Sequence, residues 1–345
     1  MNKQDILSLD ISEIKKICTD CGEKTFRAQQ IYQWIWKNRV RSFSEMTNLS
    51  ANFRTFLETH YYFKTVSVLS TQKSKDGSIK IAFQLEDKQI IEGVLIPSGK
   101  RITACISSQV GCGLHCTFCA TGSLGSIKNI SVGEITDQLF HIDEISQNTY
   151  QQSVTNIVYM GMGEPLLNYD AVLASVNRLT DVNGTGISPT RITISTVGVA
   201  DNIKKLADDN CPCNLAVSIH FPDDARRNTY MPINKKFNLS TLSESLAYYH
   251  QKTNKRISIE YTLLKNVNDS LEDASLLGHF TKRFPVKINL IEYNPYPASP
   301  FQASDTHTRE NFAAFLERLN LIVTIRYSKG KDIDAACGQL AKKKR

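Results

Sequence analysis

The sequence predicts an α/β protein in which a partial, TIM-like (β/α)6 barrel follows a small N-terminal α+β accessory domain. Three observations lead to this fold class. From about residue 98 to residue 335, short runs rich in β-branched residues alternate with amphipathic stretches, which is the pattern of parallel βα units. Only six or seven such units are present, too few for a closed eight-fold barrel. Residues 1–90 lack this alternation, because a helical half precedes a strand-rich half.

The accessory domain, predicted over residues 1–90, begins with amphipathic helix. Its apolar residues include i, i+4 pairs with basic residues between them: Phe26, Ile31, Tyr32, Ile35 and Trp36, with Arg27, Lys37, Arg39 and Arg41 interspersed. An ordinary amphipathic helix, with its apolar side toward the core and its basic side toward solvent, explains this pattern. The basic side could equally lie along the phosphate backbone of a nucleic acid. Strands are predicted at 66–69, 79–83 and 90–96, with a turn at Asp76-Gly77 and a stop at Pro97.

The barrel is predicted over residues 98–335. Its strands are expected at residues 102–108, 156–160, 191–195, 214–220, 256–263, 287–293 and 321–326. Its helices are expected at residues 132–146, 170–180, 200–208, 240–252, 270–284 and 308–319. Barrels of this kind carry their active sites at the carboxyl ends of the strands. Residues 336–345 are predicted to form a C-terminal loop that carries Cys337 and ends in a basic tail.

Composition narrows the class of protein. The chain has 345 residues, 41% of them apolar, and a formal charge of +7, of which the accessory domain supplies more than half. This charge permits a polyanionic partner without requiring one. No run of eighteen apolar residues occurs and the start of the chain is polar, so we expect a cytoplasmic protein with no membrane contact. The nine cysteines of such a protein stay reduced, which favours metal binding or catalysis.

Three of these cysteines form a C-x-x-x-C-x-x-C triplet, namely Cys112, Cys116 and Cys119. Three thiolates can hold three irons of a [4Fe-4S] cluster and leave the fourth iron open to a substrate. No fourth cysteine follows nearby, although clusters that only carry electrons normally have one. A Cys3His zinc site with His115 and a set of buried structural cysteines are the alternatives.

The triplet, with an aromatic residue before its last cysteine, resembles the signature of the radical S-adenosylmethionine (SAM) superfamily. The resemblance implies the partial barrel, one [4Fe-4S] cluster and SAM, which is cleaved reductively to a 5′-deoxyadenosyl radical. It assigns SAM binding to residues at or near predicted strand ends: Gly163, Glu164, Ser195, Ser218, Ile219, His220 and Asn294. A polar residue at a barrel rim is ordinary when alone, but so many together favour a ligand site.

Two further segments, around Cys105 and around Cys337, make the resemblance more specific. They are similar to bacterial RNA methyltransferases that modify carbon 2 of adenosine in 23S ribosomal RNA and in transfer RNA, and the similarity spans nearly the whole chain. Carbon 2 is electron-poor and cannot attack the SAM methyl group directly, whereas a thiolate can. The resemblance implies that Cys337 takes the methyl group from one SAM and that a second SAM supplies the radical. Cys105 then resolves the protein–RNA adduct by forming a disulfide with Cys337.

The same resemblance nominates Glu92 as the acceptor of the ring proton, with the Cys105 thiolate as a rival. It also implies a reductase or flavodoxin-type electron donor. The base must be taken out of folded RNA before a radical can reach it. We expect Cys18, Cys21, Cys211 and Cys213 to be incidental thiols rather than a zinc site.

Two other functions remain open. A sister enzyme that methylates carbon 8 of adenosine shares the cluster, SAM and the two catalytic cysteines. The Leu95-Ile96-Pro97 and Ser328-Lys329-Gly330 segments favour carbon 2, although the family more often has arginine at the position of Lys329. A non-catalytic, metal-stabilised RNA-binding protein would leave Cys105 and Cys337 unexplained.

Overall fold

The computed structural model describes residues 3–297 and 299–341. The predicted basic tail at 342–345 lies outside the described residues. A ten-stranded sheet forms the centre of the molecule, in the spatial order β14-β13-β12-β11-β10-β9-β6-β5-β4-β3. Its strands are β3 (Ser67–Lys73), β4 (Ile79–Gln84), β5 (Ile90–Ser98), β6 (Arg101–Cys105), β9 (Asn156–Tyr159), β10 (Ile192–Thr196), β11 (Asn214–Ser218), β12 (Ile257–Leu263), β13 (Val286–Glu292) and β14 (Ile322–Arg326).

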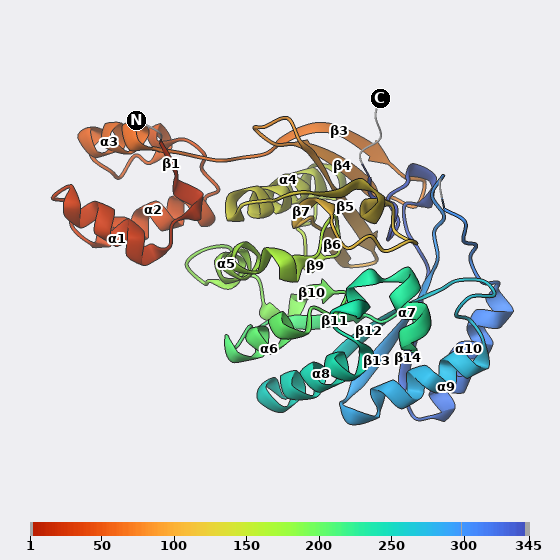
Figure 1. Ribbon diagram of the computed structural model, residues 1–345. Helices are drawn as coiled ribbons and strands as arrows, with labels where there is room; N and C mark the ends of the chain where they lie inside the picture. Colours follow the sequence, from red (N-terminus) through yellow and green to blue (C-terminus); the bar gives the residue numbers. More distant parts are fainter. Residues whose placement is uncertain (1–2, 298, 342–345) are drawn as a thin grey trace.

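The strands from β6 to β14 are parallel and curve into an open barrel (Figure 1). Six helices connect them and cover the outer face of the sheet: α4 (Val132–Tyr150), α5 (Tyr169–Thr180), α6 (Ala200–Asp208), α8 (Leu239–Thr253), α9 (Leu271–Phe280) and α10 (Thr306–Arg318). Strand β12 is buried along its whole length because it faces the helices on one side and the barrel interior on the other. The predicted partial (β/α)6 barrel is therefore confirmed.

All seven predicted barrel strands and all six predicted helices are present, with ends shifted by a few residues. One helix was missed: α7 (Asp224–Tyr230) has seven residues and no clear apolar periodicity. The hairpin of β7 (Gln109–Cys112) and β8 (Gly125–Asn129) was also missed. The stop expected at Pro97 was wrong by one residue, because β5 there pairs only with β6 and a strand without a second neighbour tolerates proline.

The sheet continues across the predicted boundary between accessory domain and barrel. Strands β3, β4 and β5 form an antiparallel meander that joins the barrel through β6. The division of the chain near residue 90 therefore stays a prediction. Figure 1 shows that the segment set apart from the barrel is the helical one before β3.

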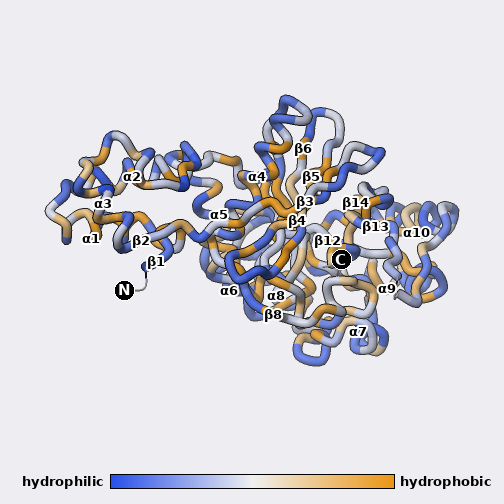
Figure 2. Tube along the Cα trace, turned by 90° about the horizontal axis from the view of Figure 1, so that it is seen from above, coloured by the Kyte–Doolittle hydropathy of each residue, from blue (hydrophilic) through white to orange (hydrophobic). Residues whose placement is uncertain are grey.

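This helical module contains α1 (Ile11–Asp20), α2 (Phe26–Trp36), α3 (Ala51–His60) and the short parallel pair β1 (Gln4–Asp5) and β2 (Tyr61–Tyr62). It extends to one side of the barrel, as Figure 2 shows from above. Asp10 and Glu13 form a capping box that starts α1. The buried face of α2 carries Ile31, Tyr32, Ile35 and Trp36 as predicted, but Phe26, at the first turn, is exposed and was wrongly included in that face.

Short 3-10 helices complete the structure: η1 (Ile6–Ser8), η2 (Phe43–Glu45), η3 (Ala120–Leu124), η4 (Pro165–Asn168), η5 (Pro189–Arg191), η6 (Pro232–Lys235), η7 (Thr281–Arg283) and η8 (Lys331–Ile333). Among the described residues, no helix is long and apolar enough to cross a membrane.

Candidate active site

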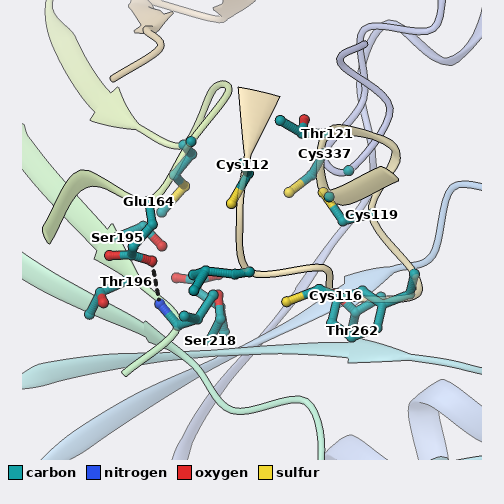
Figure 3. Close-up of a pocket in the computed structure, with 18 of the residues that line it drawn as sticks. Cys112, Cys116, Cys119, Thr121, Glu164, Ser195, Thr196, Ser218, Thr262 and Cys337 are labelled. Atoms are coloured by element: carbon teal, nitrogen blue, oxygen red, sulfur yellow. Dashed lines mark hydrogen bonds between the residues drawn. The ribbon is translucent and has the colours of Figure 1, made fainter. Parts of the chain in front are cut away.

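One cavity lies at the carboxyl ends of the barrel strands and encloses about 1050 Å³ of space, including its open mouth. Side chains from the cysteine loop, from the ends of β9 to β13 and from the C-terminal loop line it together. Figure 3 shows the sulfur atoms of Cys112, Cys116, Cys119 and Cys337 around this cavity, with Glu164 and Ser195 across from them. Segments more than 200 residues apart in sequence thus meet at one site.

The cysteine loop is shaped by the β7–β8 hairpin and by close backbone contacts. Cys112 is the last residue of β7, and the Cys119 N–H donates to the Cys116 carbonyl at 3.2 Å. Gly122 follows the loop, and a Cβ atom there would lie 2.9 Å from the Cys116 carbonyl oxygen. Only glycine fits at this position, because the backbone at residue 122 packs directly against the backbone of Cys116.

The three thiols suit a cluster better than a single ion. Burial raises the pKa of Cys112 to about 12 and raises that of Cys116 further, so a cation is needed to hold them as thiolates. Within residues 3–297 and 299–341, no three His, Cys, Asp or Glu side chains converge on one point. A cubane cluster needs no such point, because it binds each thiolate at a different iron. His115, which the zinc alternative requires, is exposed and does not line the cavity.

Gly163 and Glu164 lie across the cavity from the cysteines. Gly163 has a φ of +97°, and a Cβ atom there would lie 2.5 Å from the Gln109 side chain, so glycine is required. The Glu164 carboxylate accepts hydrogen bonds from the Leu166 N–H at 3.0 Å and the Val197 N–H at 2.9 Å. Burial raises the pKa of Glu164 to about 7.

Five of the seven predicted SAM-binding residues line the cavity: Gly163, Glu164, Ser195, Ser218 and His220. Ile219 and Asn294 do not line it. The Ile219 side chain packs into the core, while its carbonyl accepts a hydrogen bond from Arg227. The Asn294 amide donates to the Ser328 hydroxyl at 2.7 Å, but its buried Oδ1 has no partner within the described residues. A buried acceptor without a partner is open to a ligand donor.

Cys337 reaches the cavity on a loop that is tied to the cysteine loop. The Ala120 N–H donates to the Gly338 carbonyl at 2.8 Å, and the Thr121 hydroxyl donates to the Leu340 carbonyl at 2.6 Å. Cys337 is an exposed residue, whereas the other described cysteines are buried or half-buried, but burial of its thiol in the cavity wall raises its pKa to about 12. The C-terminal loop therefore presents its thiol to the same cavity as the cluster ligands.

Cys105 and Glu92 are not among the residues that line the cavity. Cys105, at the end of β6, is 7% exposed and close enough to Cys337 for the charge of Cys337 to raise its pKa, although burial is the larger cause. Both thiols are free, so the predicted disulfide between Cys105 and Cys337 is not formed in this structure. The Glu92 carboxylate accepts a hydrogen bond from the Ala341 N–H at 2.9 Å and lies 3.6 Å from the Lys80 Nζ.

Several lining residues were not predicted, namely Thr121, Thr196, Glu260 and Thr262. Glu260 carried a signal, since a carboxylate inside the apolar strand β12 needs a polar surrounding. Its side chain accepts a hydrogen bond from the Asn289 amide at 2.7 Å. Of the cysteines expected to be incidental, Cys18, Cys211 and Cys213 lie in the core and Cys21 packs against it.

Comparison with known proteins matches this arrangement over the whole chain. The family model of the ribosomal RNA large subunit methyltransferase N-terminal domain matches residues 4–62, and that of the radical SAM superfamily matches residues 106–277. The chain is 47% identical to the probable dual-specificity RNA methyltransferase RlmN of Cytophaga hutchinsonii, over 99% of this chain and 93% of that protein. A protein of the same name from Christiangramia forsetii is 46% identical, over 99% and 97% of the two chains.

A solved structure agrees with these relatives. The crystal structure of a radical SAM methyltransferase from Sphaerobacter thermophilus superimposes with a TM-score of 0.91 at 34% identity. The match covers 98% of this chain and 99% of that one. Both the helical module and the barrel thus have counterparts in a single solved protein.

Proposed function

We propose that this chain, which belongs to the RlmN family of dual-specificity radical SAM RNA methyltransferases, methylates carbon 2 of an adenosine in 23S rRNA and in tRNA. One observation carries the residue roles. The thiol of Cys337 lines the same cavity as the three cysteines of the C-x-x-x-C-x-x-C loop. A thiol in this place can accept a methyl group and hold it where a radical is generated.

The cofactors of the family are one [4Fe-4S] cluster and SAM. The reduced cluster supplies the electron that cleaves the SAM sulfonium to a 5′-deoxyadenosyl radical. In this chain, Cys112, Cys116 and Cys119 are the proposed ligands of three irons. The strand ends opposite them, with Glu164, Ser195 and Ser218, are the proposed binding surface for SAM. Asn294 does not line the cavity, and it remains a proposed SAM contact because its buried Oδ1 has no hydrogen-bond partner within the described residues.

Cys337 is the proposed methyl carrier. Its thiolate displaces the sulfonium sulfur of a first SAM, so that a C–S bond forms on Cys337 and S-adenosylhomocysteine leaves. The S-methyl group then provides the hydrogen atom that the radical from a second SAM removes. The S-methylene radical left on Cys337 adds to carbon 2 of adenine, which ordinary displacement chemistry cannot methylate. The adduct radical then loses one electron, which the oxidised cluster could accept, and the ring proton.

Cys105 is the proposed resolving thiol, because it is buried close to Cys337 at the end of β6. Its thiolate attacks the sulfur of Cys337, so that an S–S bond forms as the S–CH2 bond breaks, and the electron pair left on the carbon takes up a proton to complete the methyl group. The disulfide that remains must be reopened by a reductant. Glu92 remains the proposed acceptor of the ring proton. Its carboxylate accepts a hydrogen bond from the Ala341 N–H, which ties it to the end of the C-terminal loop.

The RNA substrate and the electron source complete the proposal. RNA is the substrate class of the family, and the dual-specificity name of the relatives supports both 23S rRNA and tRNA as partners. A reductase or flavodoxin-type protein is the proposed electron donor. The cytoplasm is the proposed location, because these RNAs are made there.

Mass spectrometry of nucleosides tests the function directly. The anaerobically reconstituted protein is incubated with unmodified 23S rRNA fragments or tRNA, SAM and a reductant. We expect 2-methyladenosine and the use of two SAM molecules for each methylated base. Formation of 8-methyladenosine would show that carbon 8, rather than carbon 2, is the methylated position. RNA binding without any SAM cleavage would contradict an enzymatic function.

A further inference from the structure

The buried guanidinium of Arg227, on α7, lies under the wall of the cavity. Its side chain is inaccessible to solvent, with a residue exposure of 0%. It donates to the carbonyls of Val197 at 2.6 Å, of Ser218 at 3.3 Å and of Ile219. These carbonyls follow or end the neighbouring strands β10 and β11. A single cation therefore links two segments whose residues Val197 and Ser218 line the cavity.

The same helix is attached to the cysteine loop. Tyr230, the last residue of α7, accepts a hydrogen bond from the Thr117 N–H at 3.1 Å, and Thr117 lies next to Cys116. Met231, which contacts the Arg227 Nη1 at 3.1 Å, shares a small apolar cluster with Cys116. The guanidinium thus lies between the cysteine loop and the strand ends.

Arg227 has no close carboxylate partner, although Asp224 on the same helix exerts a weaker electrostatic attraction on it. In the part of the chain that the structure describes, it forms no ion pair within 4.0 Å, although its neighbour Arg226 pairs with Asp223 and Asp273. Its Nε is buried without a hydrogen-bond partner among those residues. A buried charge with this surrounding is costly unless an anionic group lies nearby. Three thiolates with a [4Fe-4S]2+ core carry a net negative charge, which grows on reduction.

We propose that Arg227 is a positioning residue that raises the reduction potential of the cluster bound by Cys112, Cys116 and Cys119 and fixes the SAM-binding ends of β10 and β11. The inference rests on the proposed function. A fixed positive charge near the cluster stabilises the more negative, reduced state, and solvent cannot screen it at a buried site. The planar guanidinium of Arg227 donates to the Val197 and Ile219 carbonyls at the same time. The single ammonium group of a lysine cannot bind both carbonyls equally well.

The test uses the reconstituted holoenzyme with Arg227→Gln, Arg227→Lys and, as the matched control, Arg226→Gln. Arg226→Gln removes a charge from the same helix, but one that is already paired and directed away from the cavity. The cluster potential is measured by anaerobic titration with electron paramagnetic resonance, beside iron content and SAM binding. We expect Arg227→Gln to retain iron and to lower the reduced fraction at fixed potential about tenfold, which corresponds to ~59 mV for one electron.

The Lys variant separates charge from geometry. We expect Arg227→Lys to keep the wild-type reduction potential of the cluster, because it retains the positive charge. It should bind SAM more weakly, because it loses the two-sided hydrogen bonding of the guanidinium. A wild-type potential in Arg227→Gln overturns the proposal. If Arg227→Gln does not retain iron, Arg227→Lys decides, since a potential displaced in that variant also overturns it. Failure of the wild-type protein to bind iron or cleave SAM would instead reject the proposed function.

Discussion

The sulfur of Cys337 is proposed to take part in methyl transfer to RNA but not in the reductive cleavage of SAM. It lines the cavity but is not one of the three cysteines proposed to bind iron. We expect Cys337→Ala to retain iron and to produce 5′-deoxyadenosine, because cluster and SAM sites are intact, and to lose all methyl transfer to RNA. Chromatography of the SAM products and mass spectrometry of the RNA measure both. Cys21→Ala, in the helical module, should retain both activities, and RNA methylation by Cys337→Ala would exclude the thiol carrier.

Cys105 gives a second prediction because it acts only after carbon has joined the RNA. Its sulfur is buried at the end of β6 and lies within hydrogen-bonding reach of the Met160 backbone. Without this thiol the covalent link between Cys337 and adenine has no resolving partner, so Cys105→Ala should accumulate RNA-linked protein. A shifted band on a denaturing gel detects it. Free, methylated RNA at the wild-type level would show that another group resolves the adduct.

His220 makes a prediction about stability. Its Nδ1 accepts a hydrogen bond from the Thr262 N–H at 3.0 Å, and burial lowers its pKa to about 3. Below its ordinary pKa of 6.5, the unfolded chain therefore binds one proton that the folded chain does not. The free energy of unfolding should decrease as pH falls from 6.5 toward 3, by about 1 kcal/mol between pH 7.5 and 5.5.

Urea unfolding of the holoenzyme at these two pH values measures this effect. His220→Gln should remove that part of the pH dependence, since glutamine cannot take up the proton. The difference between the two proteins isolates His220 from the other titrating groups. An equal pH dependence in both proteins would contradict a neutral, buried imidazole.

Among the elements, the C-terminal loop depends on a turn far away in sequence. Asp332 accepts hydrogen bonds from the Ser74 hydroxyl at 2.5 Å and the Lys75 N–H at 3.1 Å, and Asp76 accepts one from the Gly330 N–H at 2.8 Å. The turn between β3 and β4 thus fixes the start of the loop that presents Cys337. An error of one ångström in the position of a reacting group can cost a hundredfold in rate.

We therefore expect Asp332→Ala to lower kcat for RNA methylation by about tenfold to a hundredfold. The KM for RNA and the SAM cleavage activity should change little, because neither site contains Asp332. Steady-state kinetics with both readouts measures this split. Asp332→Asn, which keeps one acceptor oxygen, should recover most of kcat. A rise in KM alone, or equal loss of SAM cleavage, would reject a role in positioning.

These elements also show what the sequence can predict. The barrel strands follow from local periodicity and were predicted correctly, and the cysteine triplet, which local spacing singles out, lines the cavity. The contacts of Asp332 with Ser74 and of Glu92 with Ala341 join residues about 250 positions apart. No local pattern encodes such pairs. Arg227 was missed for a related reason, since α7 is short and its buried cation has carbonyl partners on two other elements.

At the scale of the whole molecule, arginine side chains from the helical module and from the barrel hold these two parts together. Arg39 pairs with Asp143 at 2.7 Å and Arg41 with Asp137 at 3.0 Å, both on α4. These arginines belong to the predicted basic face, so that part of its charge serves the attachment of the module. The remaining exposed lysines, including Lys15, Lys16 and Lys24, are available for an RNA backbone.

Arg178, on α5, is the buried centre of this attachment. It donates to the Leu9 carbonyl at 2.9 Å, and its guanidinium lies 6.0 Å from the Tyr32 ring centroid and 5.8 Å from that of Trp36. Together these contacts are worth about 1–3 kcal/mol. We expect Arg178→Met to loosen the module without disturbing the cavity. The backbone amides of the helical module should exchange hydrogen faster and the KM for RNA should rise. Iron content and SAM cleavage should stay at wild-type levels.

Hydrogen exchange followed by mass spectrometry measures the loosening, and Lys205→Met is the matched control. Lys205, on α6, lies 4.1 Å from the Tyr169 ring centroid and pairs with Asp170, and both of these partners belong to α5, the helix that carries Arg178. If the module holds RNA for the barrel, only Arg178→Met should combine faster exchange with weaker use of RNA. Faster exchange with an unchanged KM for RNA would mean that the barrel alone binds the substrate. Unchanged exchange would mean that the pairs on α4 suffice to hold the module.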